Sequence, residues 1–207
     1  MSKDRELAKL LLRAGERKLQ KDYQGALTLY HEAIGQFGDN ANVFVAIALC
    51  HYLITADPGE VYSKGHEKEA VYWMKRAIEL APNCGHWHYL LGEIYHVMWS
   101  DDENAVQEHR QAIALNPYDA LVLFNSAGFH GPPENLVSLE EAIGWVERAV
   151  QLSPRNPDYH FRLGKLYQEA GRLAEARELW LEILLWTSDL SPEYVHRVRR
   201  ALDSAPL

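Results

Sequence analysis

One arrangement of small and large residues recurs five times along this chain and constrains its fold more than any other feature. Each copy has an alanine, a larger residue four positions later, and an alanine or isoleucine three positions after that. The copies begin at Ala26, Ala70, Ala105, Ala142 and Ala176. Residues spaced in this way share one face of a helix, and the small ones let a second helix approach closely. The chain is therefore predicted to pack its helices in pairs.

The spacing between the copies is nearly constant. Successive first alanines lie 44, 35, 37 and 34 residues apart. In three copies a proline follows the second small residue by five positions, at Pro82, Pro117 and Pro154, and Gly38 takes that place in the first copy. Proline lacks the amide hydrogen that a helix interior needs, so it ends one helix and starts the next element. A period near 34 residues predicts an array of helical hairpins.

The fifth copy, residues 156–186, shows the repeated unit most fully. Two amphipathic segments are joined by Ala170-Gly171-Arg172, and the first of them carries Leu163-Gly164 and Tyr167. The period and these positions resemble the tetratricopeptide repeat family over about residues 5 to 186. The resemblance implies an all-α, right-handed α-solenoid of five helix–turn–helix units, forming one domain over residues 1–207.

The pattern also sets expected boundaries. The repeats are expected at residues 5–40, 41–84, 85–119, 120–156 and 157–188, and the helices of the first four at 4–20, 23–35, 42–54, 67–80, 85–98, 103–115, 119–128 and 139–152. Ser191-Pro192-Glu193 then starts a capping helix over 191–203, with a cap serine, a proline in the first turn and an acidic residue. We expect this helix to cover the apolar end formed by Leu184, Leu185 and Trp186, because solenoid ends need such a cap.

Extra residues relative to a 34-residue period fall between the two helices of a repeat. The second repeat holds ten of them, around Asp57–His66; the third holds one near Ser100–Asp102, and the fourth holds three within Gly131–Asn135. These turns lie along one edge of a hairpin array, where insertions often mark a functional face. Loop length that solvent tolerates explains them equally, because extra loop residues cost little. Both interpretations stay open.

Composition and charge restrict the function. The formal net charge of −8 argues against a general nucleic-acid binder, which needs a basic surface. Cys50 and Cys84 form no CxxC pair, and the apolar run Leu10–Leu12 is too short for a signal peptide or a membrane span. We therefore expect a cytoplasmic protein with no membrane contact.

Ten histidines raise the question of a metal site. A structural zinc site needs two pairs of ligands, and the cluster Cys84–His88 has no second pair. A zinc-protease helix that began at His66 would need a second histidine at position 70, where the chain has Ala70. The repeat register instead gives packing positions to His51, His88, His109 and His160. Phosphate-loop, dinucleotide, nucleophile-elbow and redox motifs are missing from the sequence. We expect no enzyme activity, no metal and no cofactor.

In the tetratricopeptide family the first helix of each repeat lines a concave groove. Carried onto this sequence, that register gives groove residues at Leu49, Tyr52, His86, Tyr89, Glu93, His96, Phe124, Asn125, Phe161, Arg162 and Lys165. The amide of Asn125 can form hydrogen bonds with a ligand backbone. The guanidinium of Arg162 can bind a carboxylate through two hydrogen bonds. The expected groove is apolar and aromatic first, then polar and basic toward the fifth repeat.

The resemblance implies a protein-interaction scaffold or adaptor that binds a partner peptide or helix in this groove. One alternative is a chaperone that holds a substrate for secretion or assembly. A second is a self-assembling structural protein, and so a homo-oligomer. Metal-dependent catalysis by the histidine cluster is a formal third alternative.

Overall fold

The structure of this chain is a computed structural model that describes residues 3–56, 65–186 and 190–205. The chain forms two compact units, Met1–Leu115 and Asn116–Leu207. They are called the N-terminal and C-terminal units below, and each is described by itself. Within the described ranges all regular elements are helices, which confirms the all-α prediction.

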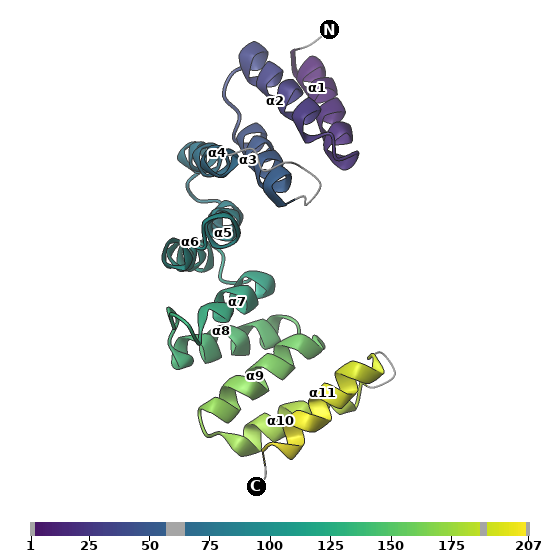
Figure 1. The fold of residues 1–207 in the computed structure, drawn as a ribbon, viewed down its shortest axis with the longest axis vertical. Coiled ribbons are helices and arrows are strands. Elements are labelled where there is room, and N and C mark those ends of the chain that lie inside the picture. The colour runs from purple at the N-terminus through teal and green to yellow at the C-terminus, as the bar shows by residue number, and fades with distance from the viewer. Residues whose placement is uncertain (1–2, 57–64, 187–189, 206–207) are drawn as a thin grey trace. The chain divides into compact units, whose positions relative to one another are not determined.

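The N-terminal unit is built from three helical hairpins (Figure 1). α1 (Lys3–Leu19) pairs with α2 (Tyr23–Phe37), and α3 (Ala41–Ala56) pairs with α4 (His66–Leu80). α5 (Gly85–Ile94) pairs with α6 (Asp102–Leu115) and continues into a π-helical turn over Tyr95–Trp99. The prediction of paired helices is confirmed in this unit.

The C-terminal unit continues the same pattern. α7 (Ala120–Ser126) ends in a 3-10 turn over Ala127–Phe129 and pairs with α8 (Leu139–Leu152), and α9 (Pro157–Glu169) pairs with α10 (Leu173–Leu184). α11 (Pro192–Asp203) packs against α10 (Figure 1). As the sequence predicts, Ser191 caps α11, because its hydroxyl accepts a hydrogen bond from the Tyr194 amide at 3.2 Å.

The repeated alanines lie where the paired helices meet. The first alanine of every copy is fully buried: Ala26, Ala70, Ala105, Ala142 and Ala176. In the third and fifth repeats, the bulky residue of the second helix packs against the first helix of its hairpin. An added Cβ at Gly92 would lie 2.3 Å from His109 Cδ2, and one at Gly164 would lie 2.3 Å from Trp180 Nε1. The Leu-Gly positions of the third and fifth repeats are therefore sites of close helix contact.

Three details differ from the sequence prediction. Residues 95–98 form a π-helical turn and residues 127–128 lie in a 3-10 turn, where the sequence predicts the ends of α-helices. Leu185 is 81% exposed. The prediction that the capping helix covers Leu185 is therefore wrong. α11 instead buries Val198 and Ala201, and the Arg177 guanidinium donates hydrogen bonds to the carbonyls of Leu202 and Ala205 at 3.0 and 2.8 Å.

Two expectations stay predictions. Residues 57–64 of the Asp57–His66 insertion lie outside the described residues, so its role stays open. The single-domain organisation of residues 1–207 and the repeat boundaries also remain predictions.

Candidate functional site

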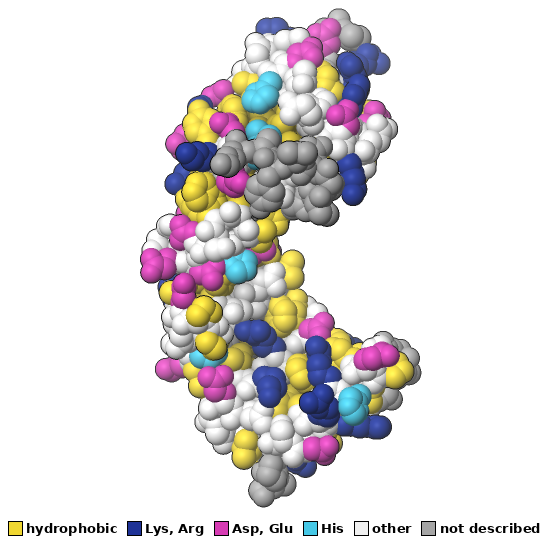
Figure 2. Space-filling model, in the orientation of Figure 1, with side chains coloured by type: hydrophobic (Ala, Val, Ile, Leu, Met, Phe, Trp, Pro, Cys, Tyr) yellow, Lys and Arg dark blue, Asp and Glu magenta, His cyan; other side chains and the backbone are white. Residues whose placement is uncertain are grey.

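The C-terminal unit contains a cavity of about 630 Å³. We call it the α9 cavity, because α9 supplies seven of the residues that line it. α7, the turn after Phe129, and α11 supply the others: Phe124, His130, Gly131, Pro132 and Arg197. Figure 2 shows Lys and Arg side chains gathered with hydrophobic ones on this face of the unit. The cavity is thus both apolar and charged.

The spacing of residues along α9 explains why they reach one cavity. Asp158, Phe161, Lys165 and Gln168 follow one another at intervals of three or four, so they share a helix face. Asn156 starts the helix, because its side-chain oxygen accepts hydrogen bonds from the amides of Asp158 and Tyr159 at 3.0 and 3.4 Å.

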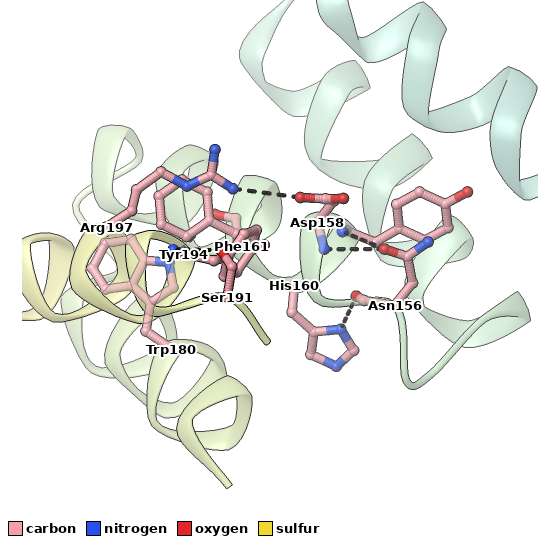
Figure 3. Close-up of polar contacts among 9 residues, drawn as sticks. Asn156, Asp158, His160, Phe161, Trp180, Ser191, Tyr194 and Arg197 are labelled. Atoms are coloured by element: carbon pink, nitrogen blue, oxygen red, sulfur yellow. Dashed lines mark hydrogen bonds and ion pairs between the residues drawn. The ribbon is translucent and has the colours of Figure 1, made fainter. Parts of the chain in front are cut away.

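The opposite side of α9 fixes its position against α10. The fully buried indole of Trp180 donates a hydrogen bond to the Phe161 carbonyl at 3.3 Å. His160 is also buried, and its Nδ1 lies 3.0 Å from the Asn156 carbonyl oxygen (Figure 3). The cavity side chains therefore project from a helix that is tightly held on its other side.

Arg162 lies at the inner wall of the cavity. Its Nη2 donates a 2.7 Å hydrogen bond to the Ala127 carbonyl, and its guanidinium lies 6.0 Å from the centre of the Phe124 ring. Nε is buried without a hydrogen-bond partner, and burial lowers the pKa of Arg162. An arginine remains charged despite such a shift. The sequence predicts that the Arg162 guanidinium binds a carboxylate through two hydrogen bonds. One of its N–H groups, on Nη2, instead holds the 3-10 turn against α9.

Arg197 enters the cavity from α11. Its guanidinium carbon lies 4.5 Å from the centre of the Phe161 ring and 4.3 Å from that of Tyr194, which are cation–π distances. Its Nη2 lies 3.4 Å from Asp158 Oδ1 (Figure 3). The two aromatic rings thus hold the guanidinium where it can meet a carboxylate.

His130 lines the cavity from the turn after α7. Its Nδ1 lies 2.9 Å from the Val137 carbonyl oxygen, and its Nε2 lies 3.1 Å from Glu169 Oε1. These two contacts connect the turn after α7 to the end of α9.

The charges in the cavity differ from those of the whole chain. Arg162, Lys165 and Arg197 face two carboxylates, Asp158 and Glu169. The cavity is therefore cationic by one charge with His130 neutral, although the chain has a net charge of −8. This arrangement can bind an apolar group and an anionic group side by side.

The predicted groove residues of the C-terminal unit mostly meet in this cavity. Phe124, Phe161, Arg162 and Lys165 line it, whereas Asn125 is half-buried on α7 and is not among the lining residues. The sequence did not indicate Arg197 as a site residue, because α11 lies outside the repeats and its arginines are typical of a solvent-exposed helix face. It also missed Asp158 and His130, which the repeat register marks as a helix start and a packing position.

The predicted groove residues of the N-terminal unit are mainly packed against neighbouring helices. Tyr89 is buried with its ring 5.1 Å from that of His109, and Glu93 Oε1 lies 3.3 Å from His109 Nε2. Leu49 and Tyr52 are half-buried, and burial, then the charge of Glu93, raises the pKa of Tyr52. His86 and His96 are exposed, and His96 Nδ1 pairs with Asp102.

The histidines in packing positions have polar partners. His51, His109 and His160 are buried, as predicted. The His51 Nδ1 lies 2.6 Å from that of His66, and His88 Nδ1 lies 2.7 Å from Glu108 Oε2. In the part of the chain that the structure describes, no group of three or more His, Cys, Asp or Glu side chains could hold a metal ion.

Burial raises the pKa of the Cys50 thiol to about 11.

No helix among the described ranges combines the length and the apolar character needed to span a membrane.

The hairpins and their small-residue contacts define the class of protein: an α-helical repeat protein. Residues 138–180 match the family model described as a TPR repeat. The repeat pattern and the fold of the chain are those of solved tetratricopeptide repeat proteins. A search of the curated proteins finds no match.

Solved structures with the same fold cover most of the chain. YrrB, a TPR protein with an unusual peptide-binding site, is 17% identical with a TM-score of 0.66, covering 92% of this chain and 90% of its own. MamA from Desulfovibrio magneticus RS-1 is 16% identical with a TM-score of 0.68, covering 89% and 97%. The thermophilic TPR protein TTC0263 from Thermus thermophilus is 18% identical with a TM-score of 0.56, covering 95% and 98%.

Proposed function

We propose that this protein is a non-catalytic interaction module that binds a segment of a partner protein in the α9 cavity. The tetratricopeptide fold supports protein–protein interaction in general. The observation that carries the finer proposal is the convergence of aromatic and cationic side chains from α7, α9 and α11 on one cavity. Buried aromatic residues and arginines supply much of the binding energy at protein interfaces.

The size and lining of the cavity fit a short segment. About 630 Å³ lies within the range of ligand-binding pockets, which bury most of a small ligand. Phe124 and Phe161 offer apolar contact, and the exposed Lys165 adds a charge at the opening. A few side chains of an extended or helical partner segment would fill this space.

The alternatives lead to different observations. A chaperone for unfolded apolar clients needs a largely apolar groove, whereas three cations line this cavity. Self-assembly would give a molar mass that rises with concentration in light scattering. A strict monomer at high concentration would remove it.

Selection of peptides on the full chain tests the proposal. We expect a display library of random dodecapeptides to yield binders of wild-type protein. Lys165→Glu places a carboxylate at the cavity, and we expect it to weaken binding of the selected peptides about tenfold. Lys165 is exposed, with Nζ 2.7 Å from Gln168 Oε1, so its replacement leaves the fold intact.

Arg199→Glu is the matched control, because it makes the same charge change on an exposed residue of α11 outside the cavity. Equal loss of affinity in the two variants would show that total charge, and not the cavity, governs binding. If no peptide is selected, the proposed function is wrong.

A further inference from the structure

The ion pair between Arg197 and Asp158 is a weak one. The nitrogen and oxygen lie 3.4 Å apart, and the side chains are 52% and 60% exposed. Exposed pairs of this kind contribute little, because water screens both charges. Nothing in this contact therefore holds Arg197 strongly against a competing anion.

The aromatic neighbours of Arg197 hold it at the cavity independently of Asp158. Its guanidinium lies within 4.5 Å of the centres of both the Phe161 and Tyr194 rings, which are 6.1 Å apart. Figure 3 shows Arg197 extending over these rings toward Asp158. A guanidinium stacked on aromatic rings keeps its N–H groups at its edge available for hydrogen bonds.

Tyr194 supplies a second observation. Its hydroxyl is buried without a hydrogen-bond partner. Burial, with Asp158 adding to the effect and Arg197 opposing it, raises the pKa of Tyr194 to about 12. Tyr194 therefore stays neutral near pH 7, so it does not neutralise the Arg197 guanidinium that its ring contacts.

We infer that the partner segment is acidic and that Arg197 selects it: an Asp or Glu side chain of the segment displaces Asp158 from the Arg197 guanidinium. This inference rests on the proposed function. The displaced pair is single and stretched, whereas an incoming carboxylate can bind the guanidinium through two hydrogen bonds. Lys165 lines the same cavity and adds attraction for the anion. α11 is therefore a wall of the binding site that determines its specificity.

Two substitutions with opposite expected effects test the inference, using the random dodecapeptide library displayed through the peptide C-termini. We expect peptides selected on wild-type protein to be enriched in Asp and Glu. Arg197→Gln should remove that enrichment and weaken the acidic peptides about tenfold. Asp158→Asn removes the internal competitor, so it should strengthen the same peptides by about threefold. Arg199→Gln, the control on the same helix, should change neither.

Each result decides a different statement. Peptides without acidic enrichment, or equal enrichment on Arg197→Gln, would overturn the inference and leave the proposed function standing. A library that yields no binder would overturn both. Circular dichroism shows whether Arg197→Gln is folded. If it is not, Asp158→Asn decides alone, and unchanged or weaker binding of acidic peptides contradicts the inference.

Discussion

At the scale of single residues, the contact between Gly164 and Trp180 shows why the repeat has its sequence pattern. The indole occupies the space where a Cβ on residue 164 would stand, 2.3 Å from Nε1. Trp180 is fully buried and donates a hydrogen bond to the Phe161 carbonyl, so it cannot move aside freely. Gly92 and His109 make the same contact in the third repeat. The glycine is needed for the close approach of the two helices.

Alanine substitutions at two helical glycines should therefore act in opposite directions. We expect Gly164→Ala to lower the free energy of unfolding by about 1–3 kcal/mol, because the added methyl group meets the buried indole. Gly144 lies inside α8, and an added Cβ there meets nothing within 4 Å. Gly144→Ala should raise the free energy of unfolding by about 0.5–1 kcal/mol, through helix propensity.

Denaturant unfolding of the full chain, followed by circular dichroism, measures both changes. Equal effects of the same sign would refute the explanation based on close packing.

At the scale of helices, the contact between α3 and α4 contains a buried pair of imidazoles. His51 on α3 is 8% exposed, and its Nδ1 lies 2.6 Å from that of His66 at the start of α4. Burial, followed by the charges of His66 and of His31 on α2, lowers the pKa of His51 to about 4. The imidazole thus acts as a neutral aromatic-sized packing residue whose polar edge is satisfied by the second histidine.

This pair should make folding sensitive to acid. The unfolded histidine has a pKa near 6.5, so the unfolded chain binds a proton first as the pH falls. The stabilisation is present above about pH 6.5 and is lost toward pH 4. Between about pH 7 and pH 4.5, wild-type protein should lose about 2–3 kcal/mol more unfolding free energy than His51→Phe does.

Carboxylates titrate in this range in both proteins, so the difference between the two curves isolates His51. Unfolding free energies measured at several pH values give both curves. Parallel curves would contradict the assigned role of the imidazole.

The helices themselves were predictable because each depends on a local repeat of apolar positions. The expected start of α9 and the cap of α11 follow from the nearby residues Asn156 and Ser191. The π-helical turn at Tyr95–Trp99 was not predictable, because its apolar spacing differs little from that of an α-helix over so short a length. The packing of α11 was not predictable either, because no repeat register extends to it.

The same limit applies to the candidate site. Register alone brings Phe124, Phe161, Arg162 and Lys165 to one cavity. The repeat register cannot show that Arg162 donates a hydrogen bond to the Ala127 carbonyl, or that Arg197 contacts Phe161 from another helix. Those contacts depend on how segments far apart in the chain pack together, and this packing cannot be predicted from a single sequence.

At the scale of the whole molecule, charge distribution matters more than total charge. The chain carries −8, which opposes an acidic ligand, but charges farther away than about 8 Å are largely screened at physiological ionic strength. Inside the α9 cavity the cations Arg162, Lys165 and Arg197 act at short range. An acidic segment can therefore bind a protein that is itself acidic.

We propose that the C-terminal unit binds its partner in the α9 cavity. Amide hydrogen exchange of the full chain, with and without a peptide selected on wild-type protein, tests that location directly. We expect slower exchange in α9, α11 and residues 130–132, and unchanged exchange in the N-terminal unit. Protection confined to the N-terminal unit, or spread evenly over the chain, would contradict binding in the α9 cavity.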